Sequence, residues 1–168
     1  GFYWVIGKEH EEPILCETAH DYFRLLPLAS NLEELIKWYE IHSIDDDEPT
    51  RIKQIAKSLN IDLPTRHPAH TPPLEELKQV VPYSPILLLW LGKSALEAGE
   101  LDEAQFYLEQ TVTVLPEYSE AHYYRVKLYR LLNKPLSSTK AMLDVLRTPL
   151  SFGGIGRRYC LYWLQEIK

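Results

Sequence analysis

Apolar residues recur at helical spacing through the second half of the chain. Residues 85–116 read PILLLWLGKSALEAGELDEAQFYLEQTVTVLP, an apolar run at 86–92 followed by mixed apolar and polar positions, with Gly99 dividing the stretch. This pattern predicts two helices, at about 85–98 and 101–115, that pack against each other. Two more helices are expected at about 119–132 and 136–147, with Asn133-Lys134-Pro135 as their turn, and a last helix at about 157–167.

The N-terminal part follows a different pattern. Residues 2–6 form a short aromatic and β-branched run, and residues 13–16 form another after a polar turn, which predicts a β-hairpin; a third strand is expected through residues 22–26. Ser30 is expected to open a helix that ends near His42, because Glu33 follows at the spacing of a capping box. Shorter helices are expected at about 51–59 and 74–81, with a proline-rich loop at 63–73 between them.

The helical pattern returns about every 34 residues. Val126 lies one period after Gly92, and Cys160 lies one period after Val126. These residues of small to moderate size form a column where helices would approach closely. A second column grows more aromatic from Ala95 to Tyr129 and then Trp163, and would fill the space between helices. Prolines end the helices at nearly the same interval, at Pro82, Pro116 and Pro149. Several columns in register predict a repeat array.

The residues of the first copy carry a family resemblance. Leu91-Gly92, Gly99, Ala104, Leu108 and Pro116 resemble the tetratricopeptide repeat (TPR), a pair of antiparallel helices that buries its apolar face only by stacking on neighbours. The resemblance covers residues 85–149 and extends less completely over 51–168. It implies a mainly α fold, an antiparallel helix-pair (TPR-like) array with a C-terminal capping helix and a small N-terminal β-hairpin.

A second resemblance concerns residues 1–42. The hairpin with Trp4, then Pro13-Ile14, Leu26 and the run from Ala29 to Ile36 are similar to the C-terminal part of a SUKH-type domain, a superfamily that includes bacterial toxin-immunity proteins. The two resemblances divide the chain. Residues 1–44 are expected to form the hairpin plus helix, as the end of a truncated domain, and residues 45–168 the helical repeats with their capping helix.

Composition limits the classes of partner. The 168 residues are 45% hydrophobic, enough for a proper core, and their formal net charge of −6 disfavours nucleic acid and anionic membranes as partners. The longest apolar stretch, 86–92, is too short to span a bilayer. Two distant cysteines, Cys16 and Cys160, are typical of reduced thiols in a cytoplasmic protein. The chain begins at Gly1 rather than Met, as an excised fragment would.

The groups that could carry chemistry do not form a reaction centre. His67 and His70 lie in the proline-rich loop without a third zinc ligand at suitable spacing, and the acidic run 45–48 lacks the alternating ligands and central glycine of a calcium loop. His20-Asp21 has no serine elbow or reactive cysteine to act on, and the glycine-rich stretch 151–156 has no phosphate-loop lysine. We therefore expect no enzyme, no metal and no cofactor.

The TPR resemblance implies a ligand-binding groove along the first helix of each repeat. Matching the family's groove positions residue by residue gives Leu89, Lys93, Leu96 and Glu97 from the first copy, and Tyr123, Lys127, Arg130 and Leu131 from the second. Lys93, Lys127 and Arg130 would converge there, which suits a carboxylate-bearing peptide, with Tyr123 as a flat apolar contact. The alternative is that these cations only solvate exposed helix faces.

Three functions follow from these observations. The first is a non-enzymatic protein–protein interaction scaffold that binds a peptide or protein segment, acidic in part, in the groove. The second is a SUKH-like toxin-immunity protein whose N-terminal unit carries the specificity and whose repeats extend it. The third, an enzyme, would need a compact titratable cluster that the sequence does not supply. Self-association through exposed Trp and Tyr residues at an array end is a further expectation.

Overall fold

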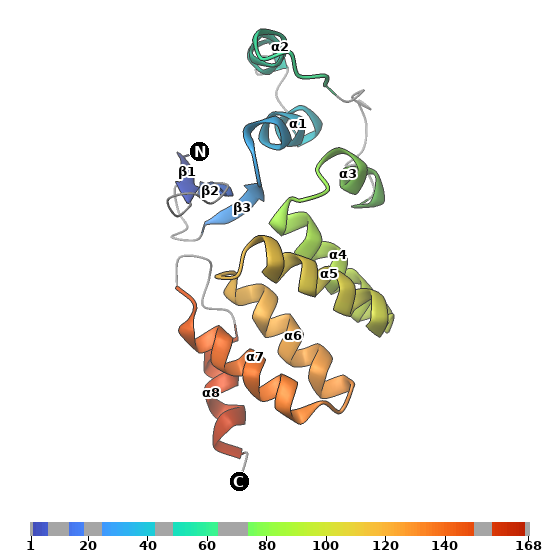
Figure 1. The fold of residues 1–168 in the computed structure, drawn as a ribbon, viewed down its shortest axis with the longest axis vertical. Helices are drawn as coiled ribbons and strands as arrows, with labels where there is room; N and C mark the ends of the chain where they lie inside the picture. The colour runs from blue at the N-terminus through green and yellow to red at the C-terminus, as the bar shows by residue number, and fades with distance from the viewer. Residues whose placement is uncertain are drawn as a thin grey trace.

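The computed structural model describes residues 2–6, 14–18, 25–42, 49–63, 74–149 and 156–166. The fold is mainly α, with a small antiparallel sheet at the N-terminus and a stack of antiparallel helix pairs in the second half, as the hydrophobic pattern predicts. Figure 1 shows the strands and the first three helices toward one end of the molecule and the last helix at the other.

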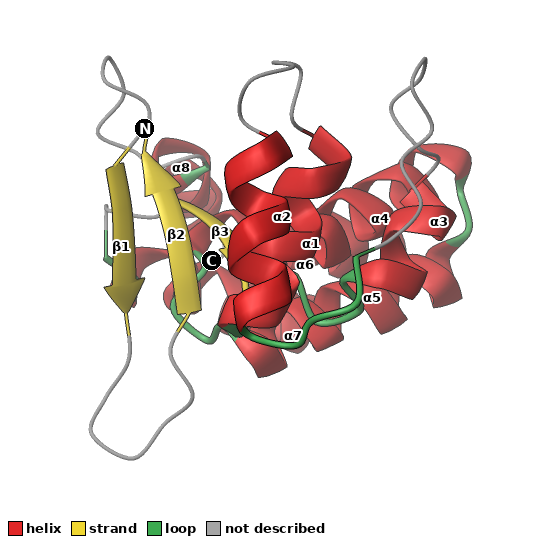
Figure 2. Cartoon of the chain, turned by 90° about the horizontal axis from the view of Figure 1, so that it is seen from above, coloured by secondary structure: helices red, strands yellow, loops and turns green. Residues whose placement is uncertain are grey.

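The sheet has three strands in the order β1-β2-β3: β1 (Phe2–Ile6), β2 (Ile14–Thr18) and β3 (Leu26–Ala29). Both pairings are antiparallel, as Figure 2 shows for β1 and β2. In the β2–β3 pairing the register shifts between Leu15 and Cys16. The third strand begins at Leu26 and so lies later in the sequence than predicted; residues 22–24 are outside the described residues. Pro27, Leu28 and Ala29 of this strand are buried and Leu26 is half-buried, because α1 and α4 pack against it.

Helix α1 (Leu32–His42) begins one residue later than the predicted cap implies. Asn31, not Ser30, caps it: Asn31 Oδ1 accepts from the backbone N–H of Glu34 at 2.9 Å. The carboxylate that accepts from the backbone before the helix is that of Glu34. Its Oε2 accepts from the backbone N–H of Ser30 at 3.0 Å and from the Ser30 hydroxyl at 2.8 Å. Glu33 instead points to solvent and pairs with Lys37. The predicted box Ser30–Glu33 is therefore wrong by one residue: the buried Glu34 takes this role, and the adjacent Glu33 does not.

Two short helices follow, α2 (Pro49–Ser58) and α3 (Leu74–Val80), where helices were expected. Helix α1 contacts α2, α3 and β3, and α3 in turn contacts α4. Trp38 of α1 lies 5.8 Å from Trp90 of α4, centroid to centroid. The N-terminal unit therefore shares its core with the helical stack, and the division at residue 44 stays a prediction.

The helical stack begins and ends its elements within one residue of the predicted bounds. Ser84 caps the first helix with its hydroxyl and Pro85 occupies the first turn, while Gly99 at φ +80° ends it in the left-handed conformation. The five helices are α4 (Pro85–Ala98), α5 (Leu101–Val114), α6 (Ser119–Leu131), α7 (Pro135–Arg147) and α8 (Arg157–Glu166).

The column of smaller residues at Gly92, Val126 and Cys160 lies where helices approach closely, as predicted. A Cβ on Gly92 would lie 2.9 Å from two side-chain carbons of Leu108, so α4 and α5 touch at this point. Val126 and Cys160, one and two periods later, are fully buried. Burial also raises the pKa of the Cys160 thiol to about 11 and that of Cys16 to about 12, so both thiols stay protonated at neutral pH.

Several predicted features lie outside the described residues, namely His20, the acidic run 45–48, His67, His70 and the loop 151–155. Among the helices that the structure describes, none combines the length and apolar character needed to cross a membrane.

Candidate functional site

The first helices of the successive pairs, together with α8, bring cations and aromatic rings onto one continuous surface. We call it the cation–aromatic surface. It consists of Lys93 from α4, four residues of α6 and two of α8: Tyr123, Tyr124, Lys127, Arg130, Tyr159 and Trp163.

Lysines and tyrosines alternate across α4 and α6. Lys93 Nζ lies 5.0 Å from the centroid of the Tyr124 ring. Lys127 Nζ lies over two rings, 4.8 Å from the centroid of Tyr123 and 4.9 Å from that of Tyr124. These distances are within the range of cation–π attraction, which holds an ammonium group in place without neutralising its charge.

The alternation continues onto α8. The guanidinium carbon of Arg130 lies 4.4 Å from the centroid of the Trp163 ring, and Trp163 stacks with Tyr123 at 6.4 Å and an interplanar angle of 8°. Tyr159 stacks on the same tyrosine at 6.3 Å. The surface is therefore complete only because α8 lies beside α6.

Among the described residues, one carboxylate forms an ion pair with a cation of this surface. Glu120 Oε1 lies 3.8 Å from Lys93 Nζ, and its side chain is 5% exposed. None of the described carboxylates forms an ion pair with Lys127 or Arg130. Lys127 is half-buried and Arg130 is exposed, so both cations can meet an anion from solvent.

The predicted groove residues separate into two groups. Lys93, Lys127 and Arg130 do converge on one surface, and Glu97 and Leu131 are exposed beside their helix ends. The prediction that Leu89 lines the groove is wrong. Leu89 is 1% exposed and belongs to the same buried cluster as Ile14 and Cys16 of β2, so it cannot contact a ligand. Leu96 is half-buried and packs against that cluster.

Tyr123 is also more buried than a ligand contact requires. It is 8% exposed because Trp163, Tyr159 and Gly156 cover its ring. Its role is therefore to support the surface under Lys127, and the exposed ring of the surface is that of Tyr159, at 58%. Tyr124, Tyr159 and Trp163 were not predicted as surface residues. The aromatic column that ends at Trp163 indicated only a ring between helices, and Trp163 is half-buried.

A polar cluster lies between α5 and α6, and Asp144 of α7 approaches it, with Oδ2 3.9 Å from His122 Nδ1. Arg125 donates to both oxygens of Glu109, which also accepts from the hydroxyl of Tyr129. His122 Nε2 lies 2.7 Å from the carbonyl oxygen of Pro116 and its Nδ1 lies 3.1 Å from Arg125 Nη1, which fits a neutral ring protonated at Nε2. Burial, with Arg125 as a further cause, lowers the pKa of His122.

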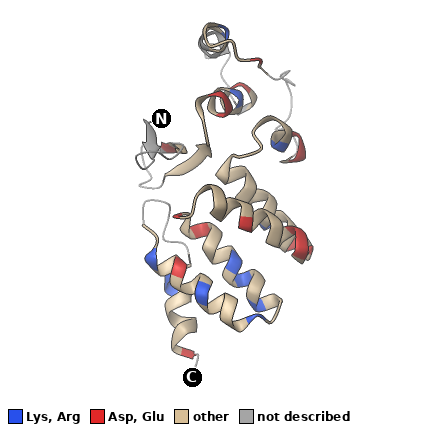
Figure 3. Cartoon of the chain, in the orientation of Figure 1, with Lys and Arg blue, Asp and Glu red and all other residues tan. Residues whose placement is uncertain are grey.

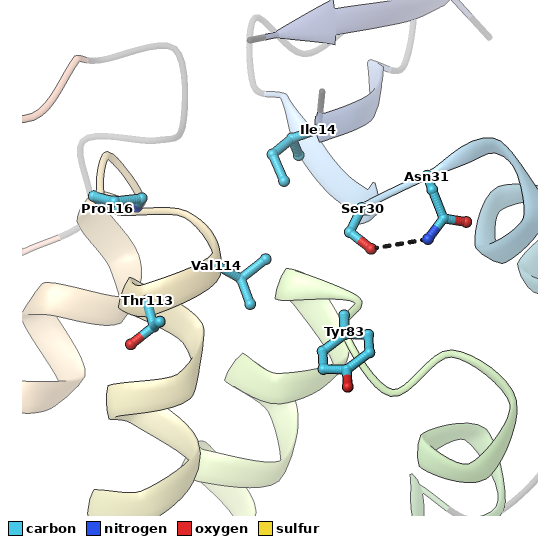
Figure 4. Close-up of a pocket in the computed structure, with 7 residues that line it drawn as sticks. All are labelled: Ile14, Ser30, Asn31, Tyr83, Thr113, Val114 and Pro116. Carbon is cyan, nitrogen blue, oxygen red and sulfur yellow. Dashed lines mark hydrogen bonds between the residues drawn. The ribbon is translucent and has the colours of Figure 1, made fainter. Parts of the chain in front are cut away.

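A cavity of about 620 Å³ lies where the N-terminal unit meets the stack. Figure 4 shows its wall, formed by residues from the sheet, the start of α1, the turn before α4 and the end of α5: Ile14, Ser30, Asn31, Tyr83, Thr113, Val114 and Pro116. None of these side chains is charged. Within the described residues, no group of three or more His, Cys, Asp or Glu could hold a metal ion.

Charge is distributed unevenly along the chain. Residues 119–168 contain nine Lys and Arg against three Asp and Glu, although the whole chain has a net charge of −6. Figure 3 shows basic residues on α6 and α7, and acidic residues on α3 and at one end of the α4–α5 pair. The positive end of the molecule is the end that carries most of the cation–aromatic surface.

Fold and surface together define a mainly α protein that stacks helix pairs on a small N-terminal sheet and presents a cationic, aromatic face. A family model described as the YfbP N-terminal domain matches residues 1–50. The chain is 28% identical over 153 residues to "Uncharacterized protein YfbP" of Escherichia coli (strain K12), an alignment that covers 91% of this chain. It spans 45% of the length of that relative. No solved structure matches the chain.

Proposed function

We propose that this chain is a non-enzymatic protein-binding scaffold of the TPR type, and that its cation–aromatic surface binds a peptide or protein segment with acidic side chains. The observation that carries the proposal is the way Lys127 and Arg130 are held. Each lies over an aromatic ring and neither is paired with a described carboxylate, so each retains its charge for a ligand.

The physical chemistry favours an acidic segment over other ligands. A hydrogen bond from a cation to a carboxylate contributes about 1.5–3 kcal/mol, and flat rings beside the cations suit the apolar parts of a peptide at little cost in side-chain entropy. The acidic balance of the whole chain disfavours nucleic acid and anionic membranes as partners. With two buried, protonated thiols, the proposal includes a cytoplasmic location.

The test uses defined peptides. An array of acidic peptides and their amide counterparts, with Glu replaced by Gln and Asp by Asn, selects a binder, and fluorescence anisotropy then measures its Kd. The Lys127→Gln/Arg130→Gln variant is expected to bind at least about tenfold more weakly, because two charge-assisted contacts are lost. Added salt should weaken binding to the unmodified chain and change it less in the variant.

Lys140→Gln is the matched control, because Lys140 is an exposed lysine of α7 outside the cation–aromatic surface. It should bind like the unmodified chain, and circular dichroism should show the same helicity for all three proteins. Equal Kd values for the double variant and the control, or equal binding of acidic and amide peptides, would contradict the proposal.

A further inference from the structure

Helix α8 presents a stripe of exposed residues that the cation–aromatic surface does not use. At the spacing i, i+3, i+4, i+7 and i+8 lie Arg158, Leu161, Tyr162, Gln165 and Glu166, which we call the outer face of α8. Leu161 is 50% exposed and Tyr162 is 57% exposed. The opposite side of the helix, with Cys160, packs against α7.

This face lies at the end of the helical stack, as Figure 1 shows for α8. Leucine and tyrosine lie at the centre of the outer face, and charged residues lie at its edges. This is the composition of a small interface, which has an apolar and aromatic core inside a polar rim.

The charges of the outer face are self-complementary in one arrangement. Arg158 and Glu166 lie four residues before and four residues after Tyr162, so each is about 6 Å from it along the helix axis, at 1.5 Å per residue. When two copies of the helix run antiparallel with their tyrosines side by side, Arg158 of each copy stands level with Glu166 of the other. A parallel arrangement would instead place like charges together.

The orientation of Glu166 fits this arrangement. Its carboxylate accepts a hydrogen bond from the Tyr162 hydroxyl, which raises the pKa of that phenol, so the carboxylate is held on the outer face. The Arg158 side chain starts one turn before Tyr162 and is exposed. Leu161 and the aliphatic part of Gln165 flank the centre on the same stripe.

We propose that the outer face of α8 is a homodimer surface, on which a second copy of this chain docks antiparallel about a two-fold axis at Tyr162. Each copy then contributes the same patch, which is the isologous contact of a closed two-fold dimer. Two equivalent pairs form between Arg158 of one copy and Glu166 of the other. This inference does not depend on the proposed acidic ligand, because the ligand surface and the outer face use different residues.

Sedimentation velocity of the 168-residue chain over a concentration series measures the dimer directly. The unmodified chain should associate reversibly. Arg158→Glu alone and Glu166→Arg alone should each weaken the dimer at least about tenfold, because each turns two attractive pairs into repulsive ones. The double variant Arg158→Glu/Glu166→Arg should restore association, because the charges are exchanged but still complementary.

Two further variants separate docking from folding. Tyr162→Ala should abolish the dimer while circular dichroism stays unchanged, because the ring is exposed in one copy. Tyr83→Ala removes a tyrosine of similar exposure, 59%, before α4 and should leave the dimer intact. A chain that stays monomeric at every concentration, single variants that dimerise like the unmodified chain, or a double variant without rescue would each overturn the inference.

Discussion

Arg125 of α6 donates through Nη2 to both carboxylate oxygens of Glu109 on α5, each at 3.2 Å. The arginine side chain is only 14% exposed, while the glutamate is 38% exposed. This ion pair joins α5 to α6. The guanidinium depends on this one carboxylate to offset the cost of its burial.

Glu109→Gln should therefore lower the free energy of unfolding by about 1–2 kcal/mol, because a largely buried cation loses its counter-charge while the exposed side of the pair is already screened by solvent. Urea denaturation followed by circular dichroism measures the change. Glu97→Gln, at an exposed glutamate of α4, is the control and should change stability by less than about 0.5 kcal/mol. Equal effects would mean that the Glu109–Arg125 pair does not contribute.

His122 should make the fold sensitive to acid. Burial is the main cause that lowers its pKa below the usual value of 6.5, and the bond from Nε2 to Pro116 only partly opposes it. His122 therefore binds a proton more readily in the unfolded chain than in the folded one. Its contribution to the free energy of unfolding is fully present above pH 6.5 and is lost as the pH falls below that value. The midpoint of thermal unfolding should drop over that range.

His122→Gln isolates this contribution, because the glutamine amide can donate to Pro116 and accept from Arg125 but does not titrate. Its thermal midpoint should fall less than that of the unmodified chain between pH 7 and pH values below 6.5. Parallel pH curves for the two proteins would show that His122 does not cause the acid sensitivity.

Gly156 determines how α8 meets α6. Its φ of +82° lies in the left-handed region, and a Cβ there would lie 2.0 Å from a ring carbon of Tyr123. Gly156→Ala should destabilise the chain by more than about 2 kcal/mol, since backbone strain of about 1–2 kcal/mol adds to the displacement of a buried ring. Trp163 fluorescence should change as the helix moves from Tyr123.

Gly99→Ala is the matched control for that variant. Gly99 has nearly the same φ, +80°, but nothing lies within 4 Å of its would-be Cβ, so the substitution carries the backbone strain alone. The excess destabilisation of Gly156→Ala over Gly99→Ala, read from urea unfolding, measures the contact with Tyr123. An excess near zero would show that α8 is not held by this contact.

Glu34 should stabilise the contact between α1 and the turn before α4. Its Oε1 accepts from the backbone N–H of Tyr83 at 3.0 Å, while its Oε2 accepts both bonds from Ser30. Glu34→Ala leaves these buried donors unsatisfied and should cost about 2–4 kcal/mol in urea unfolding. Glu33→Ala loses only an exposed pair with Lys37 and should cost less than about 0.5 kcal/mol. Similar values for the two would contradict the capping geometry.

Helix positions in this chain are local properties. A period near 3.6, a glycine at 99 and a proline at 85 each act over a few residues of the chain, so the pattern alone predicts α4 to α8 within one residue. The same is true of the packing column at Gly92, because a missing side chain permits close approach wherever the two helices meet. The resemblance to TPR groove positions also implied that Lys93, Lys127 and Arg130 would share a surface.

Burial depends on elements that are distant in the sequence. Leu89 has the pattern of a groove residue, but it joins the buried cluster that contains Ile14 and Cys16 of β2, and that contact cannot be read from α4 alone. Tyr123 is covered only because α8 returns to lie against α6. The choice between Glu33 and Glu34 as the capping carboxylate was likewise decided by Tyr83, 49 residues further on. The chain determined its helices through short-range periodicity, while the tertiary structure decided which side chains remain open to a ligand, because exposure is a property of the whole packed molecule.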